Sequence, residues 1–113
     1  MRAIAHRCGL DAAMTVIEGK WKVSILWALG EHPCCRFGRL RRLLPGVTEK
    51  VLASHLREME RDGLVRREVH DEVPPRVEYS LTDRGRALNL ALEPLGEWGR
   101  ENVPVPSVDG ATG

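Results

Sequence analysis

The segment spanning residues 37–81 constrains the fold most, because it carries two amphipathic helical patterns separated by a proline–glycine turn. Pro45 and Gly46 end the first helix and turn the chain toward the second. Two short helices joined in this way have the geometry of a helix-turn-helix. In the first helix the apolar side chains share one face and the arginines lie off it; these are Phe37, Leu40, Leu43 and Leu44 against Arg39, Arg41 and Arg42.

The second pattern is typical of a recognition helix, with one apolar face and one basic face. Thr48 is a candidate N-cap, and Glu49 behind it suits the positive end of the helix dipole. The apolar stripe recurs at helical spacing and ends at a glycine: Leu52, Leu56, Met59 and Gly63. A second face at the same spacing holds Lys50, Ser54, Arg57 and Arg61.

A β-hairpin is predicted directly after this helix. Residues 64–70 and 76–81 alternate between apolar and polar side chains, and residues 71–75 between them place Pro74 and Pro75 near the expected tip. A hairpin in this place is a wing. The predicted fold class is therefore mostly α with a small β-hairpin, a winged helix-turn-helix.

Two helices that flank the motif are predicted to form a homodimer interface, because their apolar stripes lie outside the minimal three-helix unit. Thr82 is the candidate N-cap of the last helix, and Pro94 is expected to kink that helix or to start a new segment. The alternative is that the last helix folds back onto its own domain. The stripes comprise Leu10, Met14 and Ile17 in the first helix and Leu88, Leu92, Leu95 and Trp98 in the last.

A further helix is predicted before the motif, over residues 20–29, with Gly30 as its C-terminal stop. The stripe of this helix comprises Trp21, Ile25, Ala28 and Leu29. The rings of Trp21 and Trp27 are expected to pack in the core, since stacking on a base requires an exposed ring.

The length and charge of the chain restrict its class. Its 113 residues allow one domain, expected over residues 1–102, with residues 103–113 as a flexible tail. The formal net charge is only +1, but arginines concentrate near the first helix of the motif, as a locally basic DNA-reading surface requires. The polar N-terminus, the lack of a long apolar run and the odd number of cysteines predict reduced thiols in the cytoplasm.

The sequence contains no pattern typical of an active site. It lacks a Ser/His/Asp arrangement, a Gly-rich phosphate loop and a metal-ligand cluster of adequate count, so no enzyme activity, cofactor or metal is expected. Cys34 and Cys35 with His32 would supply three ligands, one fewer than a closed tetrahedral zinc site. A disulfide between adjacent cysteines would be strained, which leaves ordinary loop cysteines as the prediction.

The predicted DNA contacts divide into base-reading and phosphate-binding residues. Bases are read from the N-terminal half of a recognition helix, where Lys50 can donate to guanine and Glu49 can accept from cytosine. The alternative is an ordinary solvated helix face, and His55 in particular could be a packing residue. The base-reading candidates are Thr48, Glu49, Lys50, Ser54 and His55, and the phosphate candidates are Arg36, Arg39, Arg57 and, at the hairpin tip, Arg76.

Cys8 has two features that favour the reactive thiolate, namely Arg7 beside it and a helix start directly after it. The alternative is a small buried apolar residue without chemistry. The residues alone leave both interpretations open.

Several motifs of the chain resemble the HxlR-type bacterial transcription regulators. They are Cys8, Gly19-Lys20-Trp21, Arg36-Phe37, Asp62-Gly63-Leu64-Val65 with Arg67, the run PPRVEYSLT from Pro74 to Thr82, Gly85 and Trp98-Gly99. The resemblance spans about residues 8–100 and implies a dimeric winged-helix DNA-binding protein. It also implies that Cys8, at the position of a sensing cysteine in several relatives, responds to oxidants or electrophiles. Two features depart from the family pattern: Gly9, where relatives commonly carry proline, and the adjacent pair Cys34-Cys35.

Together these features predict a transcriptional regulator that binds a pseudo-palindromic operator in double-stranded DNA as a homodimer, without a membrane partner. Cys8 would supply redox or electrophile sensing. The alternative function is a winged-helix module that binds protein rather than DNA, which the low net charge permits.

Overall fold

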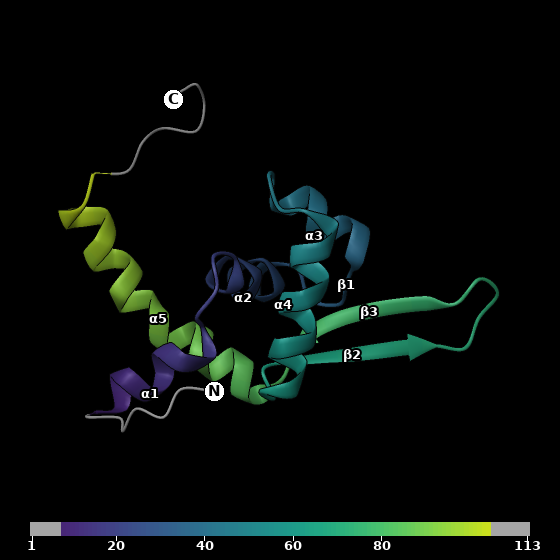
Figure 1. Cartoon of the computed structure of the whole chain (residues 1–113), viewed down its shortest axis with the longest axis horizontal. Coiled ribbons are helices and arrows are strands. Elements are labelled where there is room, and N and C mark those ends of the chain that lie inside the picture. The colour runs from purple at the N-terminus through teal and green to yellow at the C-terminus, as the bar shows by residue number, and fades with distance from the viewer. Residues whose placement is uncertain (1–7, 105–113) are drawn as a thin grey trace.

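The computed structural model describes residues 8–104, whose helices and strands follow in winged-helix order (Figure 1). The helices α1 (Gly9–Val16) and α2 (Lys22–Glu31) precede a short strand, β1 (Cys35–Arg36). Next come α3 (Phe37–Leu43) and α4 (Glu49–Arg61), the strands β2 (Val65–His70) and β3 (Arg76–Leu81), and α5 (Asp83–Asn102). The predicted fold class, a mostly helical winged helix-turn-helix, is confirmed. Arg7 and residues 105–113 of the predicted tail lie outside the described residues.

The sheet of the wing has three antiparallel strands in the order β1–β3–β2. The hairpin strands β2 and β3 pair along their whole length, as predicted. The prediction that Cys34 and Cys35 are both loop cysteines was wrong for Cys35, because Cys35 and Arg36 pair with Tyr79 and Glu78 of β3. Two residues are too few to show the alternation by which a strand is recognised, so the third strand left no pattern in the sequence.

The core forms where α2, α3 and α4 meet the base of the wing (Figure 1). Burial of one large aliphatic side chain stabilises a fold by about 1.5–3 kcal/mol, and most of the predicted apolar stripes contribute such residues. The core therefore holds α4 by its apolar face and leaves the opposite face in solvent. The largest fully buried side chains are Ile25, Leu26, Leu29, Leu40, Leu52, Leu56, Met59, Leu64 and Val65.

Local interactions fix both ends of α4. Thr48 Oγ1 accepts a hydrogen bond from the Val51 N–H at 3.1 Å, which confirms the predicted N-cap. At the other end Gly63 adopts φ +78°, a left-handed conformation that favours glycine, and the Leu64 N–H donates to the Met59 carbonyl. The recognition helix thus starts and stops where the sequence indicates.

Thr82 fastens the start of α5 to the end of α4. Its hydroxyl donates to the Gly63 carbonyl at 2.6 Å and accepts from the Gly85 N–H at 3.0 Å, which confirms Thr82 as an N-cap. Gly85 approaches this junction so closely that a Cβ there would overlap the Leu64 carbonyl oxygen. A larger residue at position 85 would therefore push α5 away from the base of the wing.

Two helices run further than their sequences suggest. α2 continues through Gly30 to Glu31, so the prediction of Gly30 as a stop was wrong. Asn89 of α5 lies so close over Gly30 that a Cβ would overlap its amide, and helix packing rather than a turn accounts for this glycine. α5 continues through Pro94 as one helix rather than starting a new one. Pro94 has no N–H, so the Leu90 carbonyl one turn earlier lacks its usual helical partner.

The tryptophans near α2 differ in exposure. Trp21 is partly buried against the core, as predicted, and the Lys20 ammonium lies 5.6 Å from its ring centroid. Trp27 is 54% exposed, so the prediction of core packing was wrong for this ring. Val23, one turn earlier in α2, is also exposed, and the two residues form an apolar patch on the surface of α2.

Candidate nucleic-acid interface

The face of α4 opposite the core carries most of the predicted base-reading residues. Glu49 and Lys50 are exposed in the first turn, and Ser54 is half-buried one turn later. The Thr48 hydroxyl already accepts the Val51 N–H, so this residue fixes the start of the helix. An exposed first turn with a lysine is suited to the acceptor edge of guanine in the major groove.

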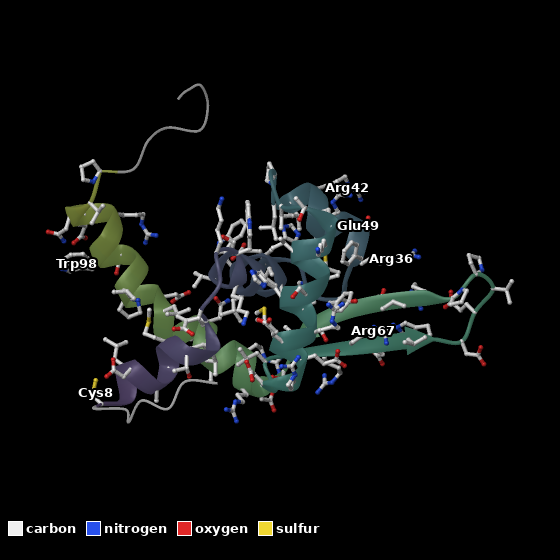
Figure 2. All side chains as sticks on the ribbon, in the orientation of Figure 1. Cys8, Arg36, Arg42, Glu49, Arg67 and Trp98 are labelled. Carbon is white, nitrogen blue, oxygen red and sulfur yellow. The ribbon has the colours of Figure 1, made fainter. Side chains whose placement is uncertain are left out.

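A basic concavity lies where α3 meets the strands β1 and β3. It has a volume of about 530 Å³ and is lined by Cys34, Arg36, Gly38, Arg39, Arg42 and Glu78. Arg39 Nη2 lies 3.1 Å from His32 Nδ1, a contact that orients this guanidinium. Figure 2 shows Arg36 and Arg42 on the same side of the molecule as Glu49. The three guanidinium groups of this concavity form a surface that suits phosphate oxygens.

A second concavity, of about 400 Å³, joins α4 to the wing. Its lining residues are Ala53, Leu56, Arg57 and Glu60 from α4 and Arg67 and Tyr79 from the sheet. Arg67 was not among the predicted phosphate contacts, yet it is exposed and lies at this junction (Figure 2). The available signal was that Arg67 shares a strand face with Val65, because residues two apart on a strand point to the same side.

His55 does not lie on this surface. Both of its ring nitrogens are buried, and neither has a hydrogen-bond partner among the described residues. The ring packs beside Gly19, where a Cβ would lie 3.1 Å from His55 Cε1 and Nε2. A ring enclosed between α4 and the connection from α1 to α2 cannot reach a base edge, so we remove His55 from the base-reading set.

Arg76 is engaged in ion pairs within the wing. Its Nη2 lies 2.9 Å from Glu72 Oε2, and its Nη1 lies 3.5 Å from Glu78 Oε2. His70 Nε2 contacts the other oxygen of Glu78 at 3.0 Å. Arg76 is also the half-buried first residue of β3 rather than part of the hairpin tip. The predicted phosphate contact is therefore not presented by this residue in the structure.

A buried lysine, which no sequence pattern indicated, holds α4 against α2. Lys22 is only 4% exposed, and its Nζ lies 2.6 Å from Glu58 Oε1. The hydrogen bond from Lys22 lowers the pKa of Glu58 from its ordinary value. Because the pair fixes the C-terminal half of α4 on α2, Lys22 and Glu58 are positioning residues for the recognition helix.

The three cysteines lie in different environments. Cys8 is the exposed N-cap residue of α1, so the alternative of a buried apolar residue was wrong. Figure 2 shows Cys8 far from Arg36 and its basic concavity. Cys34 is exposed at that concavity, whereas Cys35 is buried in β1. Burial raises the pKa of the Cys35 thiol.

The predicted dimer residues divide between the core and the surface. Ile17 is buried within its own subunit, and Leu88 and Leu92 pack partly against the same core. The first half of α5 thus follows the alternative in which this helix folds back onto its own domain. The exposed members are Leu10, Met14, Leu95 and Trp98.

Comparison with known proteins identifies the family. The family model described as HxlR-like helix-turn-helix matches residues 16–106 of this chain. The chain belongs to this HxlR-like family. A Bacillus subtilis relative, the uncharacterized HTH-type transcriptional regulator YtcD, is 42% identical over 87% of this chain and 77% of its own length.

Solved structures of other regulators have the same HxlR-like architecture. The redox regulator HypR in its oxidized form is 42% identical, with a TM-score of 0.77 over 87% of this chain and 100% of that chain. The reduced form of the transcriptional regulator YodB from Bacillus subtilis is 27% identical, with a TM-score of 0.76 over 87% and 96% of the two chains.

As an HxlR-like protein, the chain is a transcriptional regulator of the helix-turn-helix type and not an enzyme. The matched region runs from the end of α1 through α5 and includes both arginine-lined concavities. Within residues 8–104, no helix has the length and hydropathy that a bilayer span requires. The same residues contain no group of three or more His, Cys, Asp or Glu side chains that could hold a metal ion.

Proposed function

We propose that this HxlR-like protein binds an operator in double-stranded DNA as a homodimer in the cytoplasm. The observation that supports this function best is the exposed first turn of α4 in a helix-turn-helix whose surface also carries two concavities lined by arginines. With α4 in the major groove, Lys50, Glu49 and Ser54 would reach base edges. Arg36, Arg39 and Arg42 on one side and Arg57 and Arg67 on the other would bind the flanking phosphates.

The proposed dimer brings α1 and the second half of α5 of each subunit together. These elements expose Leu10, Met14, Leu95 and Trp98, which are large apolar side chains that a partner would bury. A two-fold axis through this interface directs both α4 helices to one side of a duplex. The operator should then be a pseudo-palindrome with half-sites about 34 Å apart.

The proposal is tested by selecting bound fragments from a random DNA library and sequencing them. Two half-sites in inverted orientation, about one helical turn apart, are the expected result. A single asymmetric site would contradict the proposed homodimer. No retardation of any fragment even at low salt would instead favour the winged-helix module that binds protein.

We also propose that Cys8 is the thiol through which an oxidant or electrophile acts. Its exposure at the start of α1 supports this role, because an oxidant or electrophile in solution can reach an exposed thiol. The similar structure named as a redox regulator, HypR in its oxidized form, supports the same class of signal. Since Cys8 adjoins the proposed dimer surface, a change there could alter the spacing of the two α4 helices.

A further inference from the structure

A groove runs along the line where α2 and α5 meet, on the opposite side of α5 from Trp98. It consists of two hollows of about 380 and 280 Å³, which share Glu31, Asn89 and Glu93 in their walls. From Asn89 to Arg100 the larger hollow follows α5 for about 16 Å. Hollows of this size lie at the lower end of the range for small-molecule sites.

The walls of the larger hollow combine an exposed aromatic ring with unpaired carboxylates. Trp27 and Val23 of α2 and Leu92 of α5 supply the apolar part, and Trp27 is 54% exposed. Glu31, Glu93 and Glu97 supply the polar part. No hydrogen bond or ion pair joins any of these three carboxylates to another side chain in the described part of the protein.

The arginines that line the groove do not neutralise its three carboxylates. Arg100 is the cation of the larger hollow. Arg86, in the smaller one, donates to the Leu81 carbonyl and forms an ion pair with Asp83. The groove is therefore electronegative, with an aromatic face within the same wall.

We propose that this groove binds an organic cation with an aromatic or branched aliphatic body. A positive charge over the face of Trp27 is attracted by the ring quadrupole, and the adjacent carboxylates add to that attraction. The apolar body of such a ligand would cover Val23 and Leu92. An organic anion of the same shape would be repelled by the carboxylates, and a neutral ligand would leave three of them without a partner.

A second copy of the chain is a poorer occupant of the groove. Gly96 and Arg100 of α5 line the larger hollow and are each two residues from Trp98, a difference of about 200° in direction around the helix. Trp98 thus projects away from the groove, whereas Leu95, three residues after the lining residue Leu92, lies closer to its edge. A dimer formed through Trp98 leaves the groove open to solvent.

A ligand in the groove would act on DNA binding through α2. The Lys22–Glu58 pair fixes α2 to the recognition helix, whereas α5 carries the proposed dimer surface. A cation that widens the space between α2 and α5 would change the angle between these two units and hence the half-site spacing. This regulatory consequence rests on the proposed function, while binding of the cation does not.

Calorimetry with tetraphenylphosphonium chloride tests the site, and sodium tetraphenylborate provides an anion of matched size and shape. We expect binding of the cation to the full chain and at least tenfold weaker binding of the anion. Trp27→Leu should weaken cation binding by about threefold to thirtyfold, as expected for loss of a cation–π contact. The double variant Glu93→Gln with Glu97→Gln should weaken it further, and Glu101→Gln, on the same helix but outside the groove, should not.

Equal affinity for the two ions, or affinity unchanged in the groove variants, would overturn the proposed site. So would a shift of the monomer–dimer equilibrium in Trp27→Leu without any cation binding, because a second copy would then be the occupant. A gel shift with saturating tetraphenylphosphonium tests the regulatory part, and undiminished operator binding would overturn it. A protein that binds the cation but never DNA would refute the proposed function and leave the site established.

Discussion

The recognition helix α4 and the second half of α5 have similar amphipathic patterns but opposite surroundings. The stripe of α4 is fully covered by its own subunit, and Lys22 also holds the helix from the α2 side. The second half of α5 leaves Leu95 and Trp98 more than half exposed. A stripe at helical spacing therefore predicts that a helix will be covered, but the position of the other elements decides whether the same chain covers it.

The largest difference between the two regions should appear in stability. Leu56→Ala should lower the free energy of unfolding by about 2–5 kcal/mol, because it leaves a cavity in the core. The matched change Leu95→Ala on the exposed stripe should alter the stability of the monomer by no more than about 0.5 kcal/mol. Urea denaturation below the dissociation constant of the dimer measures both. Similar losses for the two variants would show that α5 is covered within its own subunit.

Dimer formation should depend on the exposed stripe of α5, which contributes little to the stability of the monomer. Trp98→Ala should weaken the dimer by about 2 kcal/mol or more, as large aromatic side chains at the centre of an interface do. Trp27→Ala is the control, since this ring is about equally exposed but lies on α2, outside the proposed dimer surface. Sedimentation equilibrium gives both dissociation constants. A parent protein that remains monomeric at micromolar concentration would refute the proposed interface.

Substitutions at the proposed base-reading and phosphate-binding residues should affect DNA binding in different ways. Lys50→Ala should weaken operator binding by about 1–3 kcal/mol and relax the preference at one base pair, if Lys50 reads a base. Arg36→Ala should weaken binding of all sequences about equally and reduce the salt dependence by roughly one counterion. Arg100→Ala, at the far end of α5, should have neither effect. If Lys50→Ala and Arg36→Ala act alike on operator and random DNA, the assignment of base and phosphate contacts is wrong.

Oxidation at Cys8, at the start of α1, should weaken DNA binding by α4. Diamide should weaken operator binding of the parent protein by about tenfold or more, within the usual range of coupling between distant sites. Cys8→Ser should abolish this response, and Cys34→Ser should preserve it. A Cys8→Ser protein that still loses DNA binding on oxidation would transfer the sensing role to Cys34 or Cys35.

The smallest expected effect is on stability, through the Lys22–Glu58 pair that joins α2 to α4. Because the Lys22 hydrogen bond lowers the pKa of Glu58, the ionised pair adds stability at neutral pH. That contribution declines as the pH falls below the ordinary glutamate value of 4.5 and through the lowered pKa of the folded state. Glu58 is partly in solvent, so Glu58→Gln should cost less than about 1 kcal/mol at pH 7. Thermal denaturation should show the difference from the parent vanishing in acid; a constant difference would contradict this.

The fold was largely predictable because its main elements depend on neighbours in the sequence. The stripe of α4 and the caps Thr48 and Thr82 involve residues a few positions apart, and periodicity reports such relations directly. The errors concern contacts between distant segments. Gly30 lies within α2 because Asn89 packs over it, and Cys35 is in a strand because Tyr79 pairs with it.

The same distinction applies to the candidate site. Lys50, Glu49 and Arg36 are exposed, as the basic face of the motif indicated. His55 lies beside Leu52 and Leu56 in the sequence, which left a packing role open as the alternative. The structure follows that alternative, because the connection from α1 to α2 encloses the ring at Gly19. Lys22 resembles a surface lysine in the sequence, and only its partner on a distant helix explains its burial. Exposure of a polar residue could thus be predicted only where no distant element comes close.

The hydroxyl of Thr82 forms a joint between α4 and α5. It joins the last turn of the recognition helix to the first turn of α5, and the bare backbone at Gly85 keeps the two in direct contact. The helix that begins at this joint, α5, is 20 residues or about 30 Å long. A rotation of about 10° at this joint would move the far end of α5 by about 5 Å and the DNA-reading end of α4, a helix of 13 residues or about 20 Å, by about 3.4 Å. Because 3.4 Å is the rise of one base pair, a small change in the angle between the two helices is enough to change the register on the duplex.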